Sequence, residues 1–151
     1  YLKMAETAEI SGDKINQTKA LHLVSASQFE SSDFQSALET AEKSVRSGEQ
    51  AGDSREAQAE LSLALYRLGR THLALCNYAE AISLGEKSIE VAEKIGEAGL
   101  RTIPFAYHLL SAVYLSLGDF EKAAFYEEKE VTLNRQLGNL RSLGNGVNSL
   151  G

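Results

Sequence analysis

Apolar side chains recur at intervals of three and four along most of the chain, which is the spacing that places them on one face of an α-helix. Two consecutive rows show the pattern most clearly, Leu65, Leu68, His72 and Leu75, then Ala81, Ile82, Ser88, Ile89 and Ala92. A short polar stretch at residues 76–78 separates the rows. The pattern therefore predicts a helix, a tight turn and a second helix.

The same turn occurs three times. Residues 32–38 (SDFQSAL), 76–82 (CNYAEAI) and 118–124 (GDFEKAA) align, and their second positions are 44 and 42 residues apart. A second marker, a Gly followed by a polar residue, recurs in steps of 40, 44 and 42 at Gly12, Gly52, Gly96 and Gly138. Two independent markers in phase establish an internal repeat, which points to stacked structural units.

Each marker has a structural role. Asp or Asn before an aromatic residue is suited to cap the N-terminus of a new helix. Each Gly of the second marker follows a helical row and is placed to end it in a left-handed conformation. One helix pair cannot bury its apolar face alone, so the pairs must stack to form a core. We therefore predict an all-α array of antiparallel helix pairs.

At these residues the chain resembles the tetratricopeptide repeat family. The family's Leu-Gly pair, followed by an aromatic or similar residue, matches Leu68-Gly69 with His72. Leu110-Ser111 with Tyr114 also fits, and Val24-Ser25 with Gln28 fits loosely. The family's small residue early in the second helix matches Ala37, Ala81 and Ala123. The resemblance implies a right-handed superhelix, an α-solenoid. The period of about 42 residues is similar to the long-helix subclass of LGN/Pins adaptors, kinesin light chains and bacterial signalling arrays.

The repeat also divides the chain. We assign residues 14–53, 54–97 and 98–139 to three repeats, residues 1–13 to the second helix of a truncated preceding repeat, and residues 140–151 to the start of a further, truncated one. We therefore expect the chain to be part of a longer protein. A second small position is Ser44 and Ser88 in the first two repeats but Glu130 in the third, which predicts looser packing there.

The resemblance implies that the first helix of each pair lines a concave groove. The groove residues predicted in this way are His22, Ala26, Phe29, Tyr66, Arg70, Leu73, Phe105, His108, Ala112 and Leu115. An exposed apolar strip with aromatic and Arg side chains is typical of an interaction surface. We expect it to bind a protein or peptide ligand, either an amphipathic helix or an extended acidic segment with a carboxylate at Arg70. Alternatively, part of the strip is packing between repeats.

Known members of the family hold the C-terminal Glu-Val-Asp of chaperones with Lys and Asn at fixed positions. The matching positions here are His22, Ala26, Tyr66 and Arg70, so this ligand is not expected. A different class of function stays open: a sensory or regulatory array in a bacterial signalling protein, controlling an attached output domain such as a nucleotide cyclase or kinase. Self-association through the exposed end helices is a third possibility.

Composition and residue spacing disfavour several other classes of partner and activity. The net charge of -6 disfavours nucleic acid as a partner, and apolar runs of only a few residues fall short of the ~20 that a membrane-spanning helix needs. The single Cys76 fits a reducing compartment, and we expect a cytoplasmic location. The three His residues lack neighbours at metal-ligand spacing, and no nucleophile and base come together. We therefore expect no metal, no cofactor and no enzymatic activity.

Overall fold

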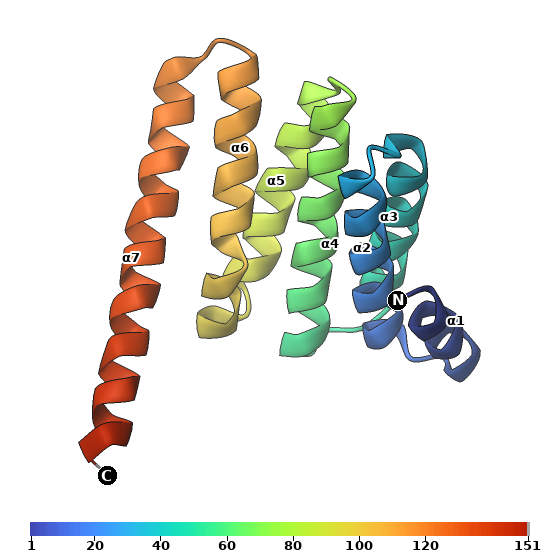
Figure 1. The fold of residues 1–151 in the computed structure, drawn as a ribbon, viewed down its shortest axis with the longest axis horizontal. Coiled ribbons are helices and arrows are strands. Elements are labelled where there is room, and N and C mark those ends of the chain that lie inside the picture. The colour runs from blue at the N-terminus through green and yellow to red at the C-terminus, as the bar shows by residue number, and fades with distance from the viewer. Residues whose placement is uncertain (151) are drawn as a thin grey trace.

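The structure, a computed structural model, describes the backbone of residues 1–150 and the side chains of residues 1–138. Its described elements are all helical (Figure 1). In chain order they are α1 (Leu2–Ser11), α2 (Lys14–Glu30), α3 (Phe34–Glu49), α4 (Arg55–Ala74), α5 (Tyr78–Glu93), the 3-10 helix η1 (Gly96–Arg101), α6 (Ile103–Ser116) and α7 (Phe120–Leu150).

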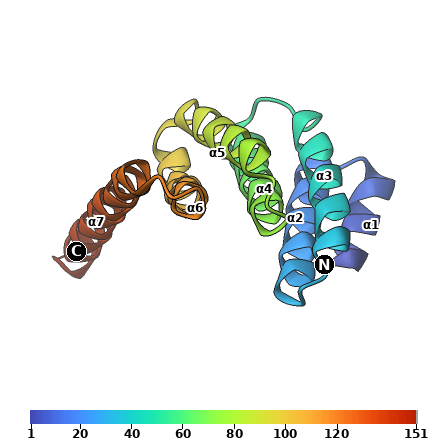
Figure 2. The ribbon, with the colours of Figure 1, turned by 90° about the horizontal axis from the view of Figure 1, so that it is seen from above.

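The helices form three stacked pairs, α2 with α3, α4 with α5 and α6 with α7. Helix α2 packs against α4 and α4 packs against α6. The backbones of α3, α5 and α7 lie further apart over the described residues, although Lys87 in α5 reaches Glu49 in α3 with an ion pair of 3.1 Å. The first helix of each pair therefore belongs to the inner layer of a curved stack, and Figure 2 shows α5 on the outer side of this curve. The prediction of an all-α solenoid is confirmed.

The three predicted tight turns share one backbone conformation. Ser32, Cys76 and Gly118 all have a positive φ, of 61°, 60° and 77°. The amide of each donates to a carbonyl three residues earlier, which closes the end of the first helix. The next residue, Asp33, Asn77 or Asp119, directly precedes the first residue of the second helix. Asp33 accepts a hydrogen bond from the Ser36 amide, and Asp119 accepts one from the Lys122 amide.

The middle turn differs in its cap. The Asn77 side chain makes no hydrogen bond to the first turn of α5, so the predicted side-chain cap is wrong there. Its Nδ2 atom instead lies 3.3 Å from Nδ1 of His72, near the end of α4. An Asn side chain carries a donor nitrogen as well as an acceptor oxygen, and here the nitrogen pairs with the imidazole while the oxygen makes no cap bond.

The predicted glycine turns form at three of four places. Gly12, Gly52 and Gly96 adopt positive φ angles of 72°, 90° and 63°. Gly138 does not, because α7 continues through it. A Gly inside a helix costs only about 1 kcal/mol, whereas the earlier turns are stabilised by the packing of α4 on α3 and of α6 on α5. The prediction that residues 140–151 begin a further repeat concerns side chains outside the described part of the chain.

Buried hydroxyl groups join the helices within each of the first two pairs. Ser44 donates to the carbonyl of Thr18 at 2.9 Å, and Ser88 donates to that of Ser62 at 2.8 Å. Pro104 and Glu130 occupy the equivalent positions in the third pair. The Glu130 side chain is too large for this close crossing, and Figure 1 shows α7 diverging from α6. The third pair is more open than the other two, as the sequence predicted.

Candidate functional site

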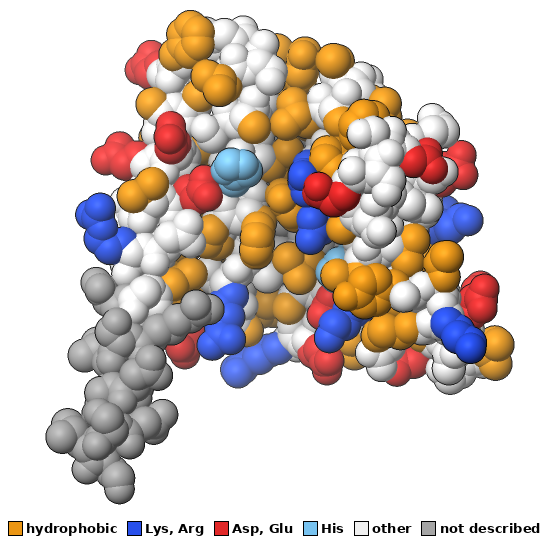
Figure 3. All heavy atoms as spheres, viewed as in Figure 1, with side chains coloured by type: hydrophobic (Ala, Val, Ile, Leu, Met, Phe, Trp, Pro, Cys, Tyr) orange, Lys and Arg blue, Asp and Glu red, His pale blue; other side chains and the backbone are white. Residues whose placement is uncertain are grey.

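A cleft of about 800 Å³ lies on the inner side of the stack. In Figure 3 the surface is hollowed between α4 and α6, with hydrophobic atoms in the hollow and charged side chains around it. Four elements contribute to its walls: α4, η1, α6 and α7. The lining residues are Tyr66, Arg70, Glu97, Arg101, Pro104, Phe105, His108, Glu130, Asn134, Leu137 and Gly138.

Two aromatic rings form one wall of the cleft. The ring centroids of Tyr66 in α4 and Phe105 in α6 are 5.5 Å apart. Tyr66 packs into a cluster with Leu109 and is only 8% exposed, whereas Phe105 is 47% exposed. Phe105 therefore keeps much of its apolar surface in water, where a ligand can cover it.

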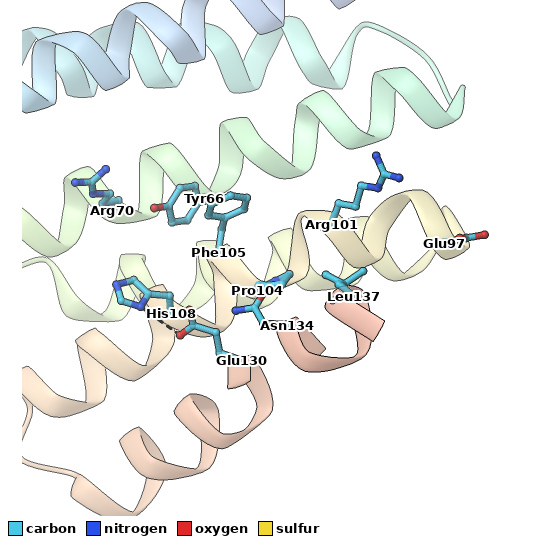
Figure 4. Close-up of a pocket in the computed structure, with 11 residues that line it drawn as sticks. Tyr66, Arg70, Glu97, Arg101, Pro104, Phe105, His108, Glu130, Asn134 and Leu137 are labelled. Atoms are coloured by element: carbon cyan, nitrogen blue, oxygen red, sulfur yellow. Dashed lines mark hydrogen bonds and ion pairs between the residues drawn. The ribbon is translucent and has the colours of Figure 1, made fainter. Parts of the chain in front are cut away.

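Cationic side chains lie on both sides of this aromatic pair (Figure 4). Arg70 lies beyond Tyr66, and Arg101 lies on the opposite side, near Glu97. Arg70 is already engaged with α2, because its Nη2 atom is 3.1 Å from Oε1 of Glu30 and its guanidinium lies 4.1 Å from the centre of the Phe29 ring. A ligand carboxylate at Arg70 would share this guanidinium with Glu30.

The opposite wall comes from α7. Glu130 reaches across to α6, where its Oε2 atom is 3.2 Å from Nδ1 of His108. Glu130 and Asn134 stand where the second pair has Ser88 and Ala92, both of which are buried. The small residues let α5 approach α4, and the larger polar ones hold α7 away from α6. The cleft therefore results from the sequence of α7.

The structure brings four of the predicted groove residues together in the cleft: Tyr66, Arg70, Phe105 and His108. Phe29 adjoins them through Arg70. The others lie elsewhere. Leu73 packs against the Tyr66 cluster, Ala26 and Ala112 are half-buried, and Leu115 is exposed but outside the cleft.

His22 has a different environment from the one predicted. It is 4% exposed, and its Nε2 atom is 2.7 Å from Oε2 of Glu60 in α4. Its side chain joins the first two helix pairs and does not reach the cleft. His108 holds the same repeat position in α6. It is exposed because, in the described part of the chain, α6 is followed by no first helix of another pair that could cover it.

Seven of the eleven lining residues were not predicted as groove residues, namely Glu97, Arg101, Pro104, Glu130, Asn134, Leu137 and Gly138. These residues come from η1, from the start of α6 and from α7. The repeat pattern predicted groove residues only along the first helix of each pair, and it placed these segments in turns or in the outer layer. Glu130 was noted only as a packing departure. The replacement of the small serine of the first two repeats by Glu130 was the signal in the sequence that α7 lies apart from α6.

The polar side chains of the lining are two Arg, two Glu, one His, one Asn and one Tyr. In the described part of the chain the lining contains no Ser, Thr, Cys or Lys side chain that could act as a nucleophile. No group of three His, Cys, Asp or Glu residues there is arranged to hold a metal ion. Among the described helices, none is both long enough and apolar enough to cross a bilayer.

Comparison with known proteins identifies a family. The family model described as tetratricopeptide repeat matches residues 60–136, which cover most of α4, all of α5 and α6, and the first half of α7. No curated protein matches the chain. The match spans more than half of the chain and includes nine of the eleven residues that line the cleft. The chain belongs to the tetratricopeptide repeat family, whose repeats are protein–protein interaction modules and generally non-catalytic.

Proposed function

We propose that this protein binds a segment of a partner protein in the cleft between α4, α6 and α7. The observation that carries the proposal is Phe105, an aromatic side chain 47% exposed inside a hollow of about 800 Å³. This volume lies within the range of about 300–1,000 Å³ that is common for ligand pockets. Aromatic anchors in pockets contribute much of the affinity of protein interfaces.

The chemistry of the walls indicates what such a segment should offer. An apolar side chain would cover Phe105 and the edge of Tyr66, which removes apolar surface from water. Arg101 makes no ion pair with another described residue, so its guanidinium is available to a carboxylate or to main-chain carbonyl groups of the segment. A short segment that combines an apolar side chain with a carboxylate fits both features.

The proposal is tested by selecting ligands from a displayed library of short random peptides and measuring their affinity by calorimetry. Phe105→Ser should weaken binding of a selected peptide by about tenfold or more. Leu115→Ser is the matched control, since Leu115 is also exposed on α6 but lies outside the cleft. Equal affinity of both variants and the native protein would place the binding surface elsewhere. Thermal melts of the variants show that each remains folded.

A further inference from the structure

Arg67 occupies a packing position on α4. The equivalent residues are Leu23 in α2 and Leu109 in α6, which are 44 and 42 residues away. Leu109 is almost fully buried and lies against Gly69 and Gly85 of the preceding pair. The second pair therefore places a guanidinium group where its neighbours place an aliphatic side chain.

This guanidinium group has no acceptor among the described residues. Its Nε atom is buried without a hydrogen-bond partner. Its central carbon lies 5.3 Å from the centre of the Tyr66 ring, which offers only a weak cation–π contact. Burial lowers the pKa of Arg67, because desolvation disfavours the charged form. A half-buried cation with an unpaired donor is unfavourable unless something supplies an acceptor.

A second guanidinium group lies one helical turn further along α4. Arg70 is close enough to Arg67 that its charge also contributes to lowering the pKa of Arg67. The nearby carboxylate is Glu30, which acts in the opposite direction, but its Oε1 atom is held by Nη2 of Arg70 and its side chain is mostly exposed. Two cations thus share one carboxylate, which leaves an excess of positive charge at this point.

We propose that Arg67 and Arg70 form an oxyanion-binding site at the junction of the first two helix pairs, which takes a carboxylate or a phosphate group. The planar guanidinium fork matches both groups, and partial burial strengthens the attraction. Because Arg70 also lines the cleft, the oxyanion belongs to the same ligand that covers Phe105, and in this respect the inference rests on the proposed function.

The test follows the Nε–Hε resonances of the arginine side chains by nitrogen–proton NMR. Inorganic phosphate and acetate are titrated separately, with chloride holding the ionic strength constant. A saturable shift of the Arg67 resonance supports the site, and the anion that saturates at lower concentration identifies the preferred group. Arg55 at the start of α4 is the control, because its side chain is exposed and lies outside the cleft. No saturable shift at Arg67, or an equal shift at Arg55, would overturn the proposal.

A variant provides a second readout. Arg67→Leu gives α4 the residue that α2 and α6 carry at this position, so it should fold and be at least as stable as the native protein. The preferred anion should raise the melting temperature of the native protein and leave that of Arg67→Leu unchanged. Equal stabilisation of both proteins would contradict the site.

These measurements need no peptide, so the two proposals fail separately. Anion binding at Arg67 without any peptide whose affinity depends on Phe105 would refute the cleft proposal alone. Peptide binding that depends on Phe105, with no anion effect at Arg67, would refute the oxyanion site alone.

Discussion

The Ser88 hydroxyl donates a hydrogen bond of 2.8 Å to the main-chain carbonyl of Ser62, and this contact fixes how closely α5 approaches α4. Ser44 makes the same bond to Thr18 in the preceding pair. In the third pair the serine is replaced by Glu130, which lines the cleft and contacts His108. One small residue in each of the first two pairs thus closes them, and its absence opens the third.

Removing the Ser88 hydroxyl should loosen the second pair. We expect Ser88→Ala to lower the free energy of unfolding by about 1 kcal/mol, the usual contribution of a buried hydrogen bond. Ser116→Ala is the control, because the Ser116 hydroxyl bonds to Ala112 at an exposed site. Urea unfolding compares the two variants, and an equal loss in both would show that the buried bond has no special role.

Introducing a glycine into the three tight turns and removing one from them should have opposite effects on stability. Ser32 and Cys76 adopt the left-handed conformation that disfavours side chains, and Gly118 adopts it without that cost. Ser32→Gly and Cys76→Gly should therefore each stabilise the protein by about 0.5–1 kcal/mol, and Gly118→Ala should destabilise it by about 1 kcal/mol. The urea midpoint measures each change. Destabilisation by Cys76→Gly would contradict the assigned turn geometry.

Gly69 allows α6 to pack against α4. A Cβ atom at this position would lie 2.6 Å from Cδ2 of Leu109. We expect Gly69→Ala to cost about 1–3 kcal/mol by overpacking. The cost should shrink when Leu109→Ala has already removed the clashing side chain, which a double-mutant cycle measures. Simple additivity of the two changes would mean that these residues do not touch.

The Asp33 cap should make stability depend on pH. Hydrogen bonds from Ser36 lower the pKa of the Asp33 carboxyl below its usual value of 3.8. A lowered pKa in the folded state contributes stability that is present above the unfolded value and is lost as the pH falls through the folded value. The stability difference between the native protein and Asp33→Ala should thus be constant near neutral pH and shrink below about pH 4. A difference that grows on acidification would contradict the cap.

The fold was predictable because its determinants are local. The residues around Asp33, Asn77 and Asp119 carry their own turn chemistry, and the apolar spacing between them needs no tertiary information. The continuation of α7 through Gly138 was not predictable, because a glycine permits a turn without requiring one and packing decides the outcome.

The site was only partly predictable. The positions of Tyr66, Arg70, Phe105 and His108 in the repeat were enough to predict them, since they share the inner face of the first helices. The repeat pattern could not locate Arg101 or Asn134, because their contribution depends on how far α7 stands from α6. Nor could it show that Glu60 covers His22, or that the guanidinium of Arg67 lacks an acceptor among the described residues, because both facts depend on side-chain contacts between pairs.

The binding site is tested most directly by mapping where a library-selected peptide contacts the protein, using amide chemical-shift changes in nitrogen–proton NMR spectra. The largest changes should cluster at the cleft, around Tyr66, Phe105 and His108 and on the facing part of α7 near Glu130. The outer surfaces of α3 and α5 should change little. Changes concentrated on those outer surfaces, with the cleft unaffected, would contradict the assignment of the cleft as the binding site.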